Sequence, residues 1–96
     1  YPTFLNPAEL QRVLRSYAGT AHVDEILIVD NAFRIQASLS ERRVGAIWYD
    51  YPVADLYESP DHVGARPGED TLTIAGVLQD GQDQLGYVAI TLSTRE

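Results

Sequence analysis

The sequence VDEILIVDNAFRIQASLSERRVGAIWYDY, residues 23–51, predicts how the sheet of this protein is built. From Phe33 to Ser40, apolar residues alternate with polar ones, which is the pattern of a strand with one buried and one wet face. Asp30 and Asn31 tolerate the positive φ that a two-residue turn requires. The stretch is therefore predicted to form three consecutive antiparallel strands.

The two turns set the register between these strands. A turn at Asp30 and Asn31 pairs Ile28 with Phe33, and a turn at residues 41–42 pairs Ile35 with Trp48. Apolar residues then meet apolar residues, whereas a slip of one position would set them against polar side chains. We therefore expect Trp48 in the core, facing Ile35.

An amphipathic helix is predicted between Asn6 and Gly19. Asn6 has the character of an N-cap, Pro7 suits the first helical position, Glu9 completes a capping box, and Gly19 favours a stop. One face of this helix is apolar and the other is polar, so the apolar stripe is expected to pack on the sheet. The apolar stripe contains Leu10, Val13, Leu14 and Tyr17, and the polar face contains Gln11, Arg12, Arg15 and Ser16.

A second hairpin is predicted from residues 70–79 and 84–94, with Asp80 and Gly81 as its turn. The expected register places Leu72, Ile74 and Leu78 on the same face as Leu85, Tyr87 and Ala89. The other face of the last strand, with Val88, Ile90 and Leu92, is equally apolar. That strand is therefore expected to be covered on both sides, by the helix or by a second protein, and we expect a homodimer.

These elements predict an α+β fold for a single domain of residues 1–96. One N-terminal helix packs on an antiparallel meander sheet of about five strands. This order of elements is similar to that of cystatin-like or hot-dog-like rolls, and a small barrel is a further possibility. No residue motif of those families accompanies the similarity in topology.

Residues 52–69 are expected to form the one long irregular segment. They include three prolines as well as Gly64 and Gly68. Residues 53–58 could form a helical turn, with Leu56 and Tyr57 folding back onto the body. Loops of this length are more often functional or mobile than simply connecting. The segment is therefore expected to be ordered near Pro52, mobile near Gly64, and able to roof a pocket.

The charge of the chain excludes some partners. The net charge is −7, and residues 1–49 contain five acids and five arginines, whereas residues 50–96 contain nine acids and two arginines. An acidic surface repels phosphate, so we expect no nucleic acid or membrane as partner. No apolar run is long enough to cross a bilayer, and the chain is expected to be soluble, with the cytoplasm as the favoured compartment.

The absence of three residue types is also informative. The sequence contains no cysteine, no lysine and no methionine. Thiolate and lysine chemistry are therefore excluded, whereas recognition of a carboxylate by arginine is not. Because an initiator methionine is missing, we expect a processed chain or an excised domain.

The candidate catalytic residues are few. Neither of the two histidines, His22 and His62, has a neighbour at a metal-ligand spacing. His62 is the better candidate because it follows Asp61, and a carboxylate beside an imidazole is a general acid–base arrangement. Asp50 and Asp55 are further candidates. The acids at positions 50, 55, 58 and 61 match no EF-hand spacing, so no metal site is predicted, and no cofactor is expected.

The candidate binding residues lie on the wet face of the predicted three-stranded unit. An arginine among tyrosines and aliphatic residues is typical of interface centres, and it could also hold a carboxylate in a cleft. The alternative is that Arg34 simply covers Tyr49. The residues of this face are Leu27, Arg34, Gln36, Ile47, Tyr49 and Tyr51.

These observations favour a non-catalytic binding or assembly module whose partner is a second copy or another protein. The alternative is a small enzyme or a small-molecule binder with a pocket roofed by residues 52–69. The nature of any ligand stays open at this stage. An apolar pocket beside His62 would favour the enzyme, and a flat apolar patch would favour the module.

Overall fold

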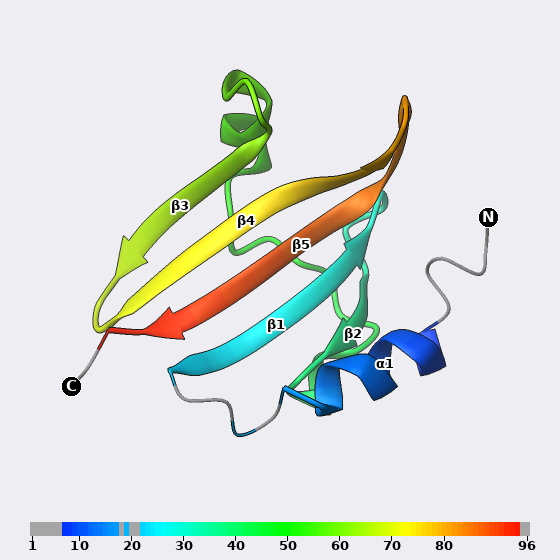
Figure 1. Ribbon diagram of the computed structural model, residues 1–96, viewed down its shortest axis with the longest axis vertical. Coiled ribbons are helices and arrows are strands. Elements are labelled where there is room, and N and C mark those ends of the chain that lie inside the picture. The colour runs from blue at the N-terminus through cyan, green and yellow to red at the C-terminus, as the bar shows by residue number, and fades with distance from the viewer. Residues whose placement is uncertain (1–6, 18, 20–21, 95–96) are drawn as a thin grey trace.

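The computed structural model describes residues 7–17, 19 and 22–94, and it contains one helix packed on a five-stranded antiparallel sheet (Figure 1). The predicted α+β fold is confirmed. The elements are α1 (Pro7–Arg15), β1 (Val23–Asp30), β2 (Ile35–Ser38), the 3₁₀ helices η1 (Glu41–Arg43) and η2 (Val53–Glu58), β3 (Val63–Gly68), β4 (Thr71–Asp80) and β5 (Asp83–Ser93).

The sheet has the strand order β2-β1-β5-β4-β3. A hairpin of β1 and β2 is joined to the three consecutive strands β3, β4 and β5 by the long pairing of β1 with β5. The sheet is open, with β2 and β3 at its two edges (Figure 1). No helix among the described residues is long and apolar enough to cross a membrane.

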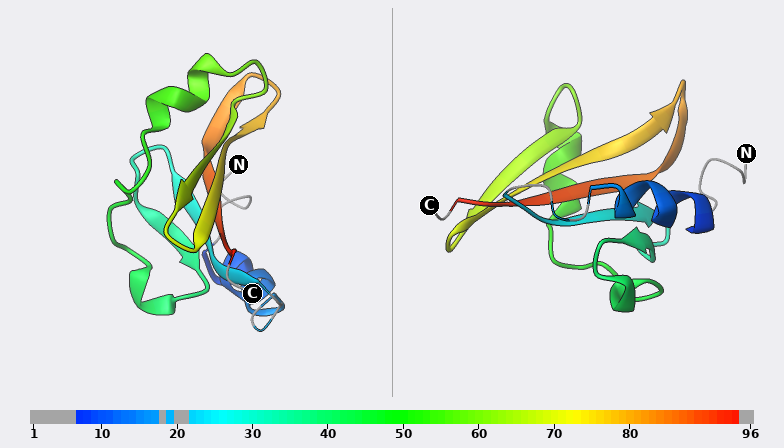
Figure 2. Two further views of the ribbon diagram at one scale, coloured as in Figure 1. Left: turned by 90° about the vertical axis from the view of Figure 1, so that its left-hand side faces the viewer. Right: turned by 60° about the horizontal axis from the view of Figure 1, so that its bottom comes forward.

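The two faces of the sheet are covered unequally. The segment with η1 and η2 crosses one face, and α1 lies on the other, over the β2 end (Figure 2). The main core lies under the first segment, where Trp48 is 4% exposed and stacks on Tyr51. This core also contains Leu27, Val29, Ile35, Leu56, Ala75, Tyr87 and Ala89. The expected burial of Trp48 is therefore confirmed.

A smaller cluster lies under α1. Leu14 is buried against Ile26 of β1 and Ala37 of β2, and Leu10 packs at its margin. The other two residues of the predicted stripe are about half exposed, Val13 at 51% and Tyr17 at 49%. The helix is short and covers only one end of the sheet, so only half of its apolar stripe meets a partner. The predicted N-cap, Asn6, lies outside the described residues.

The first hairpin has a longer turn than the sequence analysis predicted. Ile28 pairs with Ala37 rather than with Phe33, and a bulge follows in the pairing of β1 with β2. The Asp30 side chain accepts hydrogen bonds from the backbone N–H groups of Ala32 and Arg34, at 2.9 and 3.0 Å. Phe33 takes a positive φ of 66°. Asp30 therefore organises a wide turn instead of a two-residue one.

The predicted third strand forms only an isolated bridge between Arg34 and Ile47. The Trp48 N–H donates to the Phe33 carbonyl at 2.7 Å, two positions from the expected pairing of Trp48 with Ile35. The 3₁₀ turn of η1 and the positive φ of Gly45 shorten the pairing. Because the shift is an even number of residues, Trp48 still faces the core.

The fifth strand lies in the segment that was expected to be a loop. Residues 53–58 form η2, as predicted, and Leu56 is fully buried, whereas residues 63–68 form the edge strand β3. Pro67 sits in this strand, opposite Leu72 of β4. Proline is tolerated there because an edge strand leaves part of its backbone unpaired.

The second hairpin is confirmed, but its register differs. Val77 pairs with Tyr87 and Ala75 with Ala89, because a bulge between Leu78 and Gln79 shifts the pairing by one residue. Gly86 lies at this bulge with a φ of 153°, and a Cβ atom there would lie 2.0 Å from the Val29 carbonyl oxygen. The shift moves Leu72, Ile74 and Leu78 away from Tyr87, onto the face that carries α1.

Candidate functional sites

One face of strands β3, β4 and β5 forms an apolar surface that α1 does not cover (Figure 2). Ala75, Tyr87 and Ala89 point into the main core, so their neighbours along β4 and β5 point to the opposite face. We call this surface the open face. It consists of Val63, Ala65, Pro67, Leu72, Ile74, Leu78, Val88, Ile90 and Leu92.

The open face has no charged side chain among these residues of the three strands. Leu72, Ile74, Val88 and Leu92 are half-buried by their own neighbours, and Val63 at the edge is 45% exposed. Only Ile90, at the border, packs with the cluster under α1. A contiguous apolar surface of this kind marks an interaction site in proteins that are otherwise polar outside.

The opposite face of the same strands holds a partly open cavity of about 220 Å³, which we call the polar pocket. Its floor is the sheet, and its walls come from residues 48–51 on one side and β3 on the other. It is lined by Leu27, Arg43, Trp48, Asp50, Tyr51, Arg66, Pro67, Gly68, Thr71, Thr73, Ala89 and Thr91.

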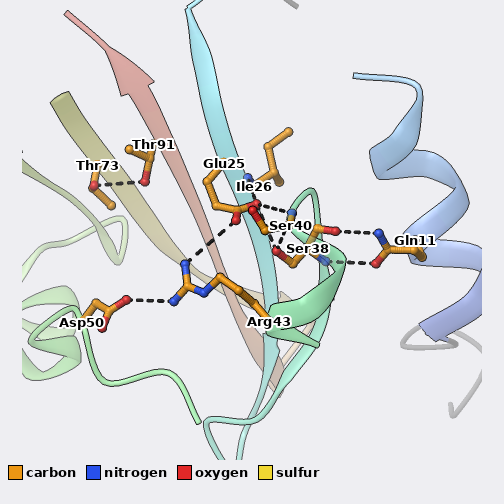
Figure 3. Close-up of polar contacts among 9 residues, drawn as sticks. All are labelled: Gln11, Glu25, Ile26, Ser38, Ser40, Arg43, Asp50, Thr73 and Thr91. Carbon is orange, nitrogen blue, oxygen red and sulfur yellow. Dashed lines mark hydrogen bonds and ion pairs between the residues drawn. The ribbon is translucent and has the colours of Figure 1, made fainter. Parts of the chain in front are cut away.

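Arg43 lies at one end of the polar pocket between two carboxylates (Figure 3). Its Nη2 donates to Asp50 Oδ2 at 2.9 Å, and its Nη1 lies 4.0 Å from Glu25 Oε2. The Glu25 side chain is only 12% exposed. The positive charge of Arg43 is therefore compensated by the carboxylates of Asp50 and Glu25.

Glu25 is held in place by the end of β2. Its Oε1 accepts hydrogen bonds from the Ser38 hydroxyl at 3.0 Å and from the Ser40 N–H at 3.3 Å (Figure 3). Ser38 is fully buried, and its backbone N–H and carbonyl both bond the side-chain amide of Gln11 on α1. Gln11 was placed on the polar face of the predicted helix, but it joins the helix to the sheet.

The floor of the pocket carries a pair of threonines. Thr73 and Thr91 are opposite each other on β4 and β5, and their hydroxyl oxygens lie 3.2 Å apart (Figure 3). Arg66 of β3 is the next residue across the sheet, because it pairs with Thr73. Arg66 is exposed, and no ion pair joins it to another described residue.

Tyr51 belongs to the main core and also lines the polar pocket. It is 8% exposed, and it packs against Gly64 of β3, where a side chain would collide with its hydroxyl. Burial raises the pKa of the Tyr51 phenol, although the positive charge of Arg66 acts in the opposite direction. The phenol therefore stays protonated and uncharged at neutral pH.

The predicted binding residues do not form one surface. Ile47 is 47% exposed and Tyr49 is 82% exposed, whereas Leu27 and Tyr51 are buried. The Arg34 guanidinium donates to the Gly45 carbonyl at 2.6 Å. A shallow apolar depression of about 300 Å³ lies beside Ile47 and Tyr49, over Phe33 and Val53. Tyr51 lines both this depression and the polar pocket, whereas Leu27 lines only the polar pocket, together with Asp50.

The predicted catalytic residues are dispersed. His62 packs its ring against Tyr57, with centroids 5.5 Å apart, and it lines neither of the two cavities described above. The Asp61 carboxylate accepts from the Ser59 hydroxyl at 2.5 Å and from the Val63 N–H at 3.3 Å. The hydrogen bond from Ser59 is the main cause that lowers the pKa of Asp61, because it favours the charged carboxylate. Asp61 thus organises the turn before β3.

The remaining candidates do not gather either. His22 is exposed with a positive φ of 70°, and Asp55 is exposed on η2. In the part of the chain that the structure describes, no three His, Cys, Asp or Glu side chains lie close enough to hold a metal ion. Of the four predicted catalytic candidates, only Asp50 lines the polar pocket.

The polar residues of the pocket that were not predicted as binding residues are Arg43, Arg66, Thr71, Thr73 and Thr91. Arg43 lies in a turn and Arg66 in a segment that was expected to be irregular, so no periodic pattern connects them. The alternation of threonine with apolar residues in TLTIA, residues 71–75, was the available signal, because it indicates a half-polar strand face.

Comparison with known proteins gives no further guide to the site. No family model matches the chain, and no curated protein matches its sequence.

Proposed function

We propose that the protein is a non-catalytic assembly module that forms a homodimer through the open face. The observation that supports this proposal is the apolar surface of β3, β4 and β5, on which α1 and the other described residues leave Leu72 and Ile74 without a covering layer. Burying such side chains stabilises a complex by about 25 cal/mol for each Å² of apolar surface removed from water.

A second copy fits this surface better than a charged partner does. The open face has no charge to complement, and a flat apolar surface is complementary to itself across a two-fold axis. The net charge of −7 resides outside the open face, so the acidic groups of the two copies stay in water. The proposed dimer interface and the acidic groups thus lie on different parts of the protein surface.

The sheet geometry also suits face-to-face packing. Two sheets pack about 10 Å apart with their strands inclined by about 30°, and their inner faces interdigitate. In such a dimer β4 lies at the centre of the open face, between β3 and β5. Ile74, opposite Ala65 and Ile90 on its two neighbours, is then the central contact residue.

The experiment is sedimentation equilibrium of the parent protein and of an Ile74→Glu variant. We expect the parent to sediment with twice the chain mass of 10.7 kDa and the variant to sediment as a folded monomer with an unchanged circular dichroism spectrum. Tyr49→Glu is the matched control, because it introduces the same charge at a site that is 82% exposed on another surface. It should leave the dimer intact.

A milder variant covers the case in which Ile74→Glu fails to fold. Ile74→Thr keeps a β-branched side chain and should weaken the dimer at least tenfold without unfolding the chain. A parent protein that sediments as a monomer at millimolar concentration would contradict the proposal. A dimer that both Ile74 variants leave unchanged would place the interface elsewhere.

A further inference from the structure

We propose that the polar pocket binds a small carboxylic acid in its ionised form, with Arg66 holding the carboxylate. The site lies on the face opposite the proposed dimer interface, so it does not depend on assembly. The inference rests on the charges, hydroxyl groups and apolar walls that converge in this cavity of about 220 Å³.

Among the residues that the structure describes, the charges of the pocket leave one cation, that of Arg66, for a ligand. Arg43 is already engaged by Asp50 at 2.9 Å and faces Glu25, so its charge is compensated. Arg66 lines the pocket from the edge strand, and none of the described carboxylates pairs with it. A guanidinium group presents paired donors that match the two oxygens of a carboxylate. An anion is therefore the complementary ligand at this end.

The threonine pair supplies a further donor. Each threonine hydroxyl has one proton and two acceptor lone pairs. The bond between Thr73 and Thr91 uses one of the two protons, so the second hydroxyl can donate into the pocket. Because Arg66 lies beside Thr73 across the sheet, a carboxylate could accept from both groups at once.

The rest of the pocket favours a short apolar body on that acid. Trp48, Leu27 and Ala89 line the inner wall, and all three are buried residues of the main core. The cavity of about 220 Å³ is small, which suits a small ligand. The carboxylates of Asp50 and Glu25, at the Arg43 end of the pocket, disfavour a ligand that carries a second negative charge. A small monocarboxylate meets all these conditions.

Nuclear magnetic resonance provides a test, because Trp48 is the only tryptophan and lines the polar pocket. Trp48 also lines the apolar depression beside Tyr49, so the Arg66 variant below assigns the signal to the polar pocket. Benzoate and propionate are titrated into the labelled protein while the indole N–H signal of Trp48 is followed. We expect a saturable shift with at least one of these acids. Neutral benzamide and cationic benzylamine should bind at least tenfold more weakly than benzoate.

Arg66→Gln tests the assigned residue, and Arg42→Gln is its matched control, since Arg42 is an exposed arginine that does not line the pocket. We expect the first variant to raise the dissociation constant at least tenfold and the second to leave it unchanged. Thr91→Val, which keeps the side-chain shape, should weaken binding by a smaller factor.

Three results would overturn the proposal. One is the absence of a saturable shift with both acids, and another is equal binding of benzamide and benzoate. The third is unchanged binding in Arg66→Gln. A monomeric Ile74→Thr variant should still bind the acid. The binding test and the dimerisation test can therefore fail independently of each other.

Discussion

The hydroxyl oxygen of Tyr51 lies 2.7 Å from the position that a Cβ atom on Gly64 would occupy. The Leu56 side chain is also close to that position, at 3.1 Å. The backbone of β3 therefore packs directly on the tyrosine that forms the wall of the polar pocket. Any residue larger than glycine has to displace that wall.

Gly64→Ala should accordingly destabilise the protein by about 1 to 3 kcal/mol, the usual cost of overpacking a core. The cause is the collision with the Tyr51 hydroxyl, so the double variant with Tyr51→Phe should recover part of the loss. Chemical denaturation of the two single variants and the double variant gives the coupling between the positions. Strict additivity would show that the two residues are not in contact.

Trp48→Ala should cost about 3 to 5 kcal/mol, because it leaves a large cavity among core side chains. Trp48 stacks on Tyr51 and lies 5.9 Å from the Tyr87 ring, between centroids. Tyr49→Ala, one position along and 82% exposed, is the control and should change stability by less than about 0.5 kcal/mol. Thermal unfolding of the two variants separates them, and similar melting temperatures would contradict the buried position of Trp48.

Gln11→Ala should cost about 1 to 3 kcal/mol, because it leaves the N–H and carbonyl groups of Ser38 without their partner at a fully buried residue. Arg12→Ala on the same helix removes only an exposed ion pair with Glu9 and should have an effect below about 1 kcal/mol. Urea unfolding of both variants measures the difference. Equal stabilities would mean that the amide of Gln11 does not anchor the helix.

Stability should fall in alkaline solution as Tyr87 ionises. Burial raises the pKa of Tyr87, and its hydrogen bond with Tyr57, at 2.9 Å, acts in the same direction. Because the folded state holds this proton more tightly, the contribution is complete below the unfolded pKa of about 10 and is lost as the pH rises through the folded value. Urea midpoints measured across this range should fall less steeply in Tyr87→Phe.

The fold class follows from the sequence because two hairpins and a capped helix carry strong local signals. The second hairpin turns at Gly81 and Gln82, one residue from the predicted Asp80 and Gly81, and the alternation of residues 33–40 identifies a strand near its observed place. The burial of Trp48 was predicted correctly although its pairing was not, because the observed pairing differs from the predicted one by an even number of residues. Parity held for Trp48, whereas the one-residue bulge in the second hairpin reversed it for Leu72 and Ile74.

The outer face of the last strand, with Val88, Ile90 and Leu92, was predicted as a possible interface. Its extension over β3 and β4, and the polar pocket, were not predicted, because both depend on a bulge and on an edge strand. The bulge before Gly86 moves Leu72 and Ile74 to the other face, which creates the open face. A glycine inside a strand pattern is the signal that indicates such a bulge. The strand β3 contains two glycines and a proline, so local preference argues against it, and pairing with β4 overrides that preference.

The two edge strands of the sheet, β2 and β3, determine whether further chains can add to it by strand pairing. On β2, the Ile35 backbone bonds Ala46 and Gly45, and the amide of Gln11 occupies the Ser38 groups. On β3, Pro67 interrupts the row of N–H donors that an added strand needs. Among the described residues neither edge offers a continuous template for another chain, so we expect the proposed face-to-face association to stop at the dimer.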